Sequence, residues 1–95
     1  MLHRAVRLPS RMLVAVRTRK GTFNATIGNI SARGARLCGL PDRITAVGDR
    51  LDILVLEHRY PAEVRWQIDD TCGVMFARPL ETGEIAAILG SRAEG

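Results

Sequence analysis

The chain has 95 residues, of which 46% are hydrophobic and 25% are charged, with 14 lysines and arginines against 10 acids. This length suits one domain with one modest core, and the hydrophobic content excludes a disordered tail. No run of 18 apolar residues occurs, so no membrane-spanning helix is expected, and the first residues lack the apolar stretch of a secretory signal.

Positive charge is concentrated at the start of the chain. The first 20 residues contain no acid, whereas the rest of the chain holds all 10 acids. The basic residues of this segment are His3, Arg4, Arg7, Arg11, Arg17, Arg19 and Lys20. A basic arm on a near-neutral body indicates either an anionic partner (nucleic acid, nucleotide or membrane surface) or a solvated tail.

The first half of the chain predicts three strands. A β-branched run over 12–18 ends at a glycine-containing hairpin signal, and alternation resumes over 23–27. The alternation breaks at Gly28, which predicts a β-bulge that re-aims the following side chains. Residues 34–38 return to extended structure, and the composition of 40–49 predicts a loop.

The second half predicts three more strands. Residues 50–56 alternate, with Leu51, Ile53 and Val55 on one face. Residues 61–68 alternate as well and place four apolar side chains on one face: Ala62, Val64, Trp66 and Ile68. An acidic turn at Asp69–Asp70 leads to the last strand, which puts three side chains on one side: Cys72, Val74 and Phe76.

The period then changes from two to that of a helix. Ile85, Ile88 and Leu89 stand at i, i+3 and i+4, and Gly90 marks the end. Six short strands followed by an amphipathic helix predict an all-β fold, a six-stranded antiparallel barrel with a C-terminal helix packed on it. The expected division is a flexible basic arm over 1–11, the barrel over 12–80, and the helix over 81–90 of the same domain.

Signatures of catalysis are missing from the sequence. His3 and His58 lack metal-ligand spacing, and the serines lack a nucleophile-elbow context. We therefore expect no catalytic residue, no metal and no enzyme. Cys38 and Cys72 stand alone, which indicates reduced thiols in a cytoplasmic protein.

Two motifs follow one another in a set order. RLPSR (7–11) is an RxxxR, and NISARG (29–34) is a (D/N)xSxxG. With GARL at 34–37, AEVRW at 62–66 and CGVMFARPL at 72–80, the chain from about residue 4 to residue 80 resembles the PilZ domain. The resemblance implies a six-stranded barrel that binds the bacterial second messenger cyclic di-GMP and signals to a protein partner.

The resemblance also implies a set of ligand-binding residues, namely Arg7, Arg11, Asn29, Ser31 and Gly34, with Arg4 and Trp66 as further candidates. Guanidinium groups suit this ligand because they pair with phosphate, match guanine O6 and N7, and stack on bases. Asn29 can accept a hydrogen bond from guanine, and Ser31 can donate one to phosphate or base. Gly34 would allow a positive φ or a close ligand approach, and Trp66 could form a wall for a guanine.

Several residues have an alternative interpretation. Asn29 and Ser31 could be turn residues that bond their own backbone, and Trp66 could belong to the core. Arg33 and Arg36 are interpreted as solvated surface charges. The arm has a second possible register, in which His3, with Arg4 beside it, and Arg7 are the motif positions and Arg11 begins the strand. Asn29 also stands where many members of the family carry Asp, which is a stronger acceptor.

Three functions are therefore compared. The leading hypothesis is a cyclic di-GMP receptor that passes its state to a protein partner. The alternatives are a PilZ-like adaptor that acts through protein contacts without the ligand, and a small barrel that binds nucleic acid. Single-strand binders usually offer stacking aromatics, and this chain has only four aromatic residues, so DNA binding is not expected. Neither a cofactor nor membrane insertion is expected.

Overall fold

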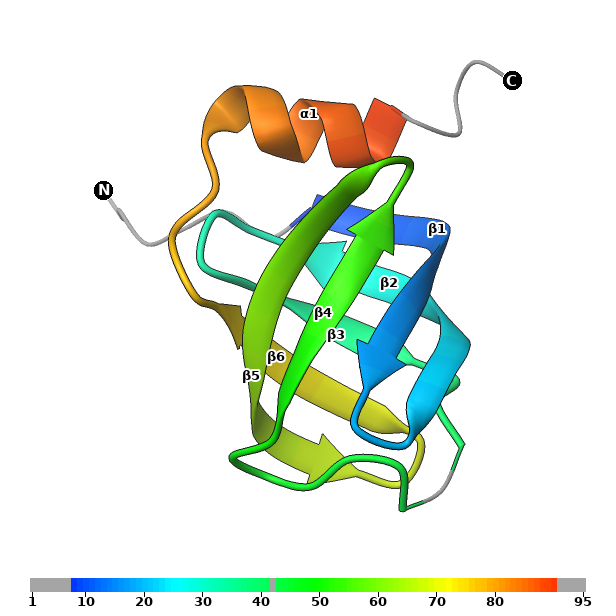
Figure 1. Cartoon of the computed structure of the whole chain (residues 1–95). Helices are drawn as coiled ribbons and strands as arrows, with labels where there is room; N and C mark the ends of the chain where they lie inside the picture. Colours follow the sequence, from blue (N-terminus) through cyan, green and yellow to red (C-terminus); the bar gives the residue numbers. More distant parts are fainter. Residues whose placement is uncertain (1–7, 42, 91–95) are drawn as a thin grey trace.

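The computed structural model describes residues 8–41 and 43–90, which form six strands and one helix (Figure 1). The elements are β1 (Leu8–Thr18), β2 (Gly21–Ile30), β3 (Gly34–Cys38), β4 (Arg50–Val55), β5 (His58–Ile68), β6 (Thr71–Phe76) and α1 (Thr82–Gly90). Within this part of the chain, no helix has the length and apolar character needed to cross a membrane.

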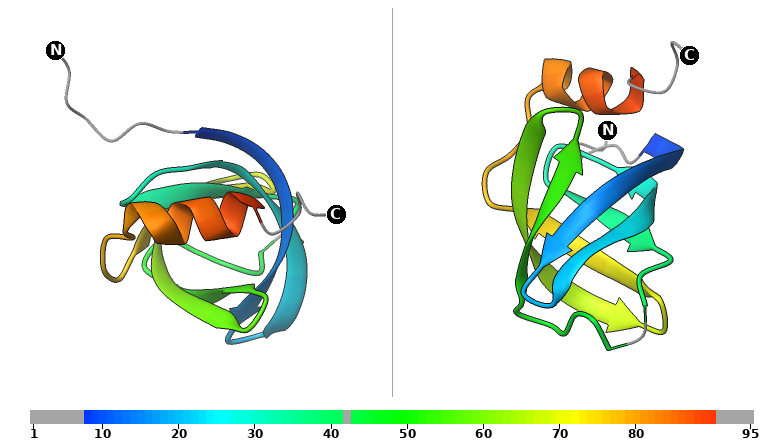
Figure 2. Two further views of the ribbon diagram at one scale, coloured as in Figure 1. Left: turned by 90° about the horizontal axis from the view of Figure 1, so that it is seen from above. Right: turned by 45° about the vertical axis from the view of Figure 1, so that its right-hand side comes forward.

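The six strands form a closed barrel in the order β1-β2-β3-β6-β5-β4, and every neighbouring pair is antiparallel. Figure 2 shows the ring from above, with α1 lying across one open end. The predicted all-β barrel with a C-terminal helix is confirmed. Because β3 pairs with β6 rather than β4, the middle of the chain meets its end on one side of the barrel.

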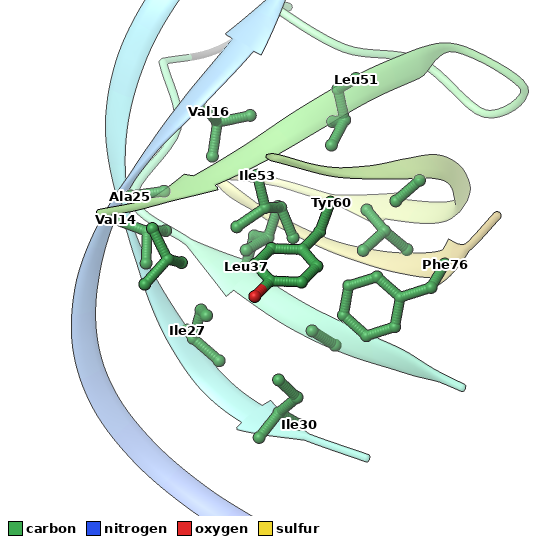
Figure 3. Packing of buried hydrophobic residues seen from close by; sticks show 14 of the residues in the cluster. Val14, Val16, Ala25, Ile27, Ile30, Leu37, Leu51, Ile53, Tyr60 and Phe76 are labelled. Atoms are coloured by element: carbon green, nitrogen blue, oxygen red, sulfur yellow. The ribbon is translucent and has the colours of Figure 1, made fainter. Parts of the chain in front are cut away.

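Alternating apolar residues fill the barrel interior. On β4, Leu51, Ile53 and Val55 are at most 5% exposed, as the alternation predicts. Figure 3 shows such side chains converging from all the strands, with Tyr60 and Phe76 among them. Burying each large apolar side chain stabilises the fold by about 1.5–3 kcal/mol relative to leaving it exposed. Ile88 of α1 is 1% exposed and joins this core from the end of the barrel, as the helical spacing predicts.

The junctions between neighbouring strands of the barrel differ in the number of residue pairs that join them. Nine register pairs join β1 to β2. Three join β1 to β4, where Ala15–Arg17 lie opposite Asp52–Leu54 and close the barrel. The junction between β1 and β4 is therefore the shortest in the ring.

Strand β1 begins earlier than the predicted strand over 12–18. Leu8 lies opposite Ile30, and Pro9 lies opposite Asn29, so β1 extends into the segment expected to be an arm. The remainder of the arm, including Arg4 and Arg7, lies outside the described residues.

The predicted bulge at Gly28 is confirmed. Ile27 lies opposite Leu37, and Asn29 lies opposite Arg36, so Gly28 is an extra residue in β2 relative to β3. The bulge shifts the alternation by one position. Ile30 therefore faces the core and is 0% exposed.

A second bulge, in β5, corrects the sequence analysis. Val64 lies opposite Val74, and Trp66 lies opposite Gly73, which leaves Arg65 as the extra residue. The prediction that Trp66 and Ile68 share the inner face with Ala62 and Val64 is therefore wrong. Their side chains are 40% and 63% exposed, respectively. The turn predicted at Asp69–Asp70 is confirmed, and Asp69 adopts a φ of 52° there.

Candidate functional site

Four residues lie side by side across four neighbouring strands. Asn29 of β2 is opposite Arg36 of β3, Arg36 is opposite Gly73 of β6, and Gly73 is opposite Trp66 of β5. Directly opposed residues of a sheet project from the same face. Ala35 and Leu37, which flank Arg36, are 1% and 0% exposed, so these four residues belong to the outer face of the barrel. We call them the outer row: Asn29, Arg36, Gly73 and Trp66.

The two bulges are what bring both ends of the outer row to the surface. In β2, Ala25 and Ile27 face the core, and uninterrupted alternation would have placed Asn29 inside as well. In β5, Val64 faces the core, and the same alternation would have placed Trp66 inside. One extra residue in each strand reverses the face of the next side chain. An amide and an indole thereby reach the surface on either side of Arg36.

Arg36 lies across a glycine. A β-carbon at residue 28 would stand 2.9 Å from Nε and 3.0 Å from Nη2 of Arg36, and 3.3 Å from Sγ of Cys38. The guanidinium thus rests over Gly28 of the neighbouring strand, in space that a side chain there would occupy. No carboxylate pairs with it in the part of the chain that the structure describes, where the ion pair is Arg78–Glu84. Its donors therefore remain available to an anionic ligand.

Trp66 also lies over a glycine. A β-carbon at residue 73 would collide with Nε1 and Cε2 of the indole, so the ring covers Gly73 directly. The side chain is 40% exposed on the outside of the barrel. Trp66 therefore does not belong to the core. Its position is compatible with the other role considered, that of a wall for a ligand on the outside of the barrel.

Ser31 is used by the turn that follows β2. Its side chain is 3% exposed. Its hydroxyl accepts hydrogen bonds from the backbone N–H groups of Arg33 (3.2 Å) and Gly34 (3.4 Å). The same hydroxyl lies 3.4 Å from the carbonyl oxygen of Gly34, to which it donates. The turn-forming interpretation therefore describes Ser31 in this structure, and the turn positions the strand end that carries Asn29.

Gly34 has a packing reason to be glycine. It is absent from the glycines with positive φ, which in the described residues are Gly21, Gly39 and Gly48. A β-carbon at Gly34 would instead collide with the carbonyl oxygen of Val74. Of the two reasons considered for a glycine here, a positive φ or a close ligand approach, the structure does not show the first. The close approach that the structure shows is that of β3 to β6, beside the outer row.

The arm segment meets this site through its backbone. Arg11 falls in β1 between the pairs Pro9–Asn29 and Met12–Ile27, where it and Ser10 together lie opposite Gly28. Its described position is limited to the backbone. The strand that continues the arm therefore runs directly beside Asn29. The choice between the two arm registers stays a prediction.

The sequence analysis did not predict that Arg36 lies in the outer row. It also did not predict that Gly28 and Gly73 make room for large side chains of neighbouring strands. Arg36 was interpreted as a solvated charge because nothing local sets it apart. Its neighbours in the row come from β2 and β6, and the β3–β6 pairing is not visible in the sequence. Gly73 gave a usable signal, since a glycine at an outward position of a strand often marks a close approach.

Comparison with known proteins agrees with this fold. A family model described as the PilZ domain matches residues 2–91. The chain therefore belongs to the PilZ domain family. It is similar to the solved structure of the Bacillus subtilis inhibitor of motility (MotI/DgrA), with 18% sequence identity and a TM-score of 0.67. That match covers 99% of this chain and 51% of the other, so this chain spans about half the length of that protein. A search of curated proteins finds no match.

Proposed function

We propose that this protein is a cyclic di-GMP receptor that binds the second messenger on the outer row and along the adjoining start of β1. One observation carries the proposal. Asn29, the first residue of the (D/N)xSxxG motif, stands on the outer wall between the strand that continues the RxxxR segment and the exposed Arg36. The backbone of residues 8–11 runs beside the end of β2, so the described part of the first motif adjoins the start of the second, which supports the proposal.

The chemistry of the wall fits a ligand with two phosphates and two guanines. Arg7 and Arg11 supply guanidinium groups that pair with phosphate or with guanine O6 and N7. Asn29 accepts a hydrogen bond from a guanine donor. Ser31 and Gly34 act by fixing the turn and the approach of β3 to β6, which hold Asn29 in place. Arg4 adds attraction at longer range.

The receptor passes its state to a protein partner and performs no chemistry of its own. Ligand bound between the arm segment and the outer row would change the surface that the barrel presents. The similar solved structure is that of an inhibitor of motility, which supports a regulatory output for this chain as well.

Calorimetry tests this function. Purified protein is titrated with cyclic di-GMP, with GMP and with a single-stranded oligonucleotide. We expect cyclic di-GMP to bind at least about tenfold more tightly than GMP, because GMP engages only one half of a two-part site. Absence of heat with micromolar cyclic di-GMP would contradict the receptor. Tighter binding of the oligonucleotide would favour the nucleic-acid alternative.

A second candidate is an adaptor that acts through protein contacts without the ligand. It is favoured by the use of the Ser31 hydroxyl within its own turn. It is also favoured by an apolar surface on β1 and the β4–β5 turn, where Leu13 and Leu56 are 65% and 77% exposed. These two side chains line a depression of about 410 Å³. The calorimetric experiment separates this adaptor from the receptor.

A further inference from the structure

We propose that this chain forms a symmetric dimer with a second copy of itself through an apolar surface on β1, β4 and the β4–β5 turn. We call this surface the β1–β4 patch: Leu13, Ala15, Leu54 and Leu56. The inference goes beyond the proposed function, because the receptor described above is a single chain and this surface lies outside the outer row.

The four residues of the β1–β4 patch are neighbours on the outside of the barrel. Ala15 lies opposite Leu54, and the residues on either side of each are at most 5% exposed, so both of these side chains point outward. Leu13 stands two residues before Ala15 on β1, and Leu56 stands two residues after Leu54 in the β4–β5 turn. A contiguous apolar surface marks an interaction site, whereas single exposed apolar residues are ordinary.

A depression lies where the pairing between β1 and β4 stops. The last register pair toward the β4–β5 turn is Ala15–Leu54, although β1 begins at Leu8. Both Leu13 and Leu56 line the depression, which measures about 410 Å³. The patch therefore offers projecting leucines together with a hollow that can receive the leucine of another molecule.

The backbone at Leu56 indicates that this side chain has a use outside the single chain. Its φ of 56° is left-handed, a conformation that glycine and asparagine adopt at lower cost than leucine. Because the side chain is 77% exposed, contacts within the chain recover little of that cost. Strained residues of this kind are concentrated at functional sites. Burial of Leu56 against a second copy would supply the stabilisation that the single chain does not.

The charges around the patch favour a second copy as its occupant. Among the described residues, the charged side chains next to the patch are two bases and two acids: Arg17, Asp52, Glu57 and Arg59. This rim has no net charge, so two copies of the patch can face one another without repulsion. A strongly acidic or strongly basic partner would find no matching charge there.

Two-fold symmetry lets each copy use both halves of its patch. In such a dimer, a contact from one residue to another is repeated in the reverse direction. An axis beside the Ala15–Leu54 pair brings Leu13 of one copy to Leu56 of the other, twice. The strand order places the β1–β4 junction across the ring from the β3–β6 junction, at the middle of the outer row. Both outer rows therefore stay open in the dimer.

Sedimentation equilibrium of the full-length protein measures this association. One chain has a mass of 10.4 kDa. We expect the average mass to rise toward twice that value between low and high micromolar concentration, because a small interface gives a weak dimer. A mass that stays at that of one chain overturns the inference and leaves the patch to a different protein.

Variants at the two exposed leucines test which surface is used. L13T introduces a residue that suits an outward strand position, and L56N introduces one that accepts a positive φ. Each should weaken dimerisation at least about tenfold, because one substitution removes two contacts from a symmetric interface. Melting temperatures at low concentration, where the monomer prevails, show that both variants are folded.

The matched control for these variants is I68T. Ile68 is 63% exposed and stands at the far end of β5 from the β4–β5 turn, so I68T should dimerise like the unmodified protein. Dimers that persist in both L13T and L56N overturn the assignment of the interface to the β1–β4 patch.

Cross-linking tests the pairing of the two leucines. L13C and L56C are made as separate proteins in a C38S background, in which the remaining native thiol, at Cys72, is buried. Under mild oxidation, a mixture of the two proteins should form an interchain disulfide between positions 13 and 56 faster than either protein alone forms its own. Mass spectrometry of the linked peptides identifies the pair. Faster linking in either protein alone contradicts the two-fold arrangement.

Discussion

Strands β4 and β5 are neighbours in the barrel, yet they present different surfaces. The pairing of β4 is regular with both of its neighbours, so Leu51, Ile53 and Val55 face the core and the residues between them face outward. Strand β5 follows the same rule only as far as Val64. After the extra residue Arg65, its apolar Trp66 is on the outside.

This difference shows how the barrel combines a core with a binding surface. The regular strand uses its whole alternation to fill the interior. Strands β2 and β5 interrupt theirs once each and expose Asn29 and Trp66 on either side of Arg36. Glycines on this wall let large side chains or neighbouring backbone come close. Substitutions near the bulged strands should therefore have different effects on stability and binding from substitutions near the regular strand β4. The following experiments test that expectation.

The largest effect is expected at Gly34, where the backbone of β6 leaves no room for a β-carbon on β3. G34A would force a methyl group into the carbonyl oxygen of Val74, and overpacking against backbone costs roughly 3 kcal/mol. Chemical denaturation measures the loss. The matched control is G83A in α1, where a β-carbon meets nothing within 4 Å. Equal stability of the two variants would contradict the close approach of β3 to β6.

The two cysteines should differ in reactivity, because Cys72 is buried and Cys38 is half-buried. Burial raises the pKa of the Cys72 thiol to about 11. At pH 8 its thiolate fraction is about a hundredfold below that of a thiol with the ordinary pKa, so alkylation of Cys72 should be slow in proportion. Cys38 is half-buried beside Arg36 and should react first, with cyclic di-GMP shielding it. Mass spectrometry after timed alkylation reads both sites, and faster modification of Cys72 would contradict its burial.

The same pKa shift predicts a pH dependence of stability. The folded-state pKa of Cys72 is above its unfolded value of 9.0, so the unfolded chain releases this proton first. The stability linked to Cys72 is fully present below about pH 9 and is lost as the pH rises toward 11. Thermal unfolding of C72A should lack this part of the alkaline decline, whereas C38S serves as the matched control.

The arm register is the next comparison, because the two registers assign the ligand to different arginines. If Arg7 and Arg11 are the motif residues, R11A should weaken cyclic di-GMP binding about ten- to a hundredfold, since each charge-assisted hydrogen bond contributes roughly 1.5–3 kcal/mol. R4A should then have a much smaller effect. R7A is damaging in both registers and serves as the control. Calorimetry at one fixed salt concentration decides, and loss of binding in R4A with normal binding in R11A would establish the other register.

The smallest effect is expected at the turn after β4, the strand with regular pairing. Leu56 adopts a φ of 56° and is 77% exposed, so its side chain gains little from burial and its backbone is disfavoured for leucine. L56G should be neutral or stabilise the protein by up to about 1 kcal/mol, and cyclic di-GMP binding should not change. A weakened receptor in L56G would show that binding extends beyond the outer row.

Much of the fold follows from local pattern. Alternation predicted the inner faces of β4 and β6, a phase change at Gly28 predicted the bulge in β2, and the spacing of Ile85, Ile88 and Leu89 predicted the helix. These features depend on residues a few positions apart, which is the range in which sequence periodicity carries information.

The site was predictable only in part. The motif residues pointed to the end of β2, but the sequence could not show that Arg36 stands opposite Gly73, because β3 and β6 are far apart in the chain. The bulge at Arg65 carried no signal, since the alternation from Ala62 to Ile68 looks unbroken. Tertiary pairing with β6 overrides that alternation and turns Trp66 outward.

The short junction between β1 and β4 has a consequence for how this barrel opens. Three register pairs close the ring, so the fluctuation that breaks the fewest hydrogen bonds is a parting of β1 from β4 while β1 stays on β2. Backbone amides at that seam should exchange with deuterium before those along β1 and β2. Strand β1, which forms this junction with β4, also runs past Asn29 and continues the arm segment. The barrel can therefore open at the β1–β4 junction while the strands that carry the outer row stay paired with one another.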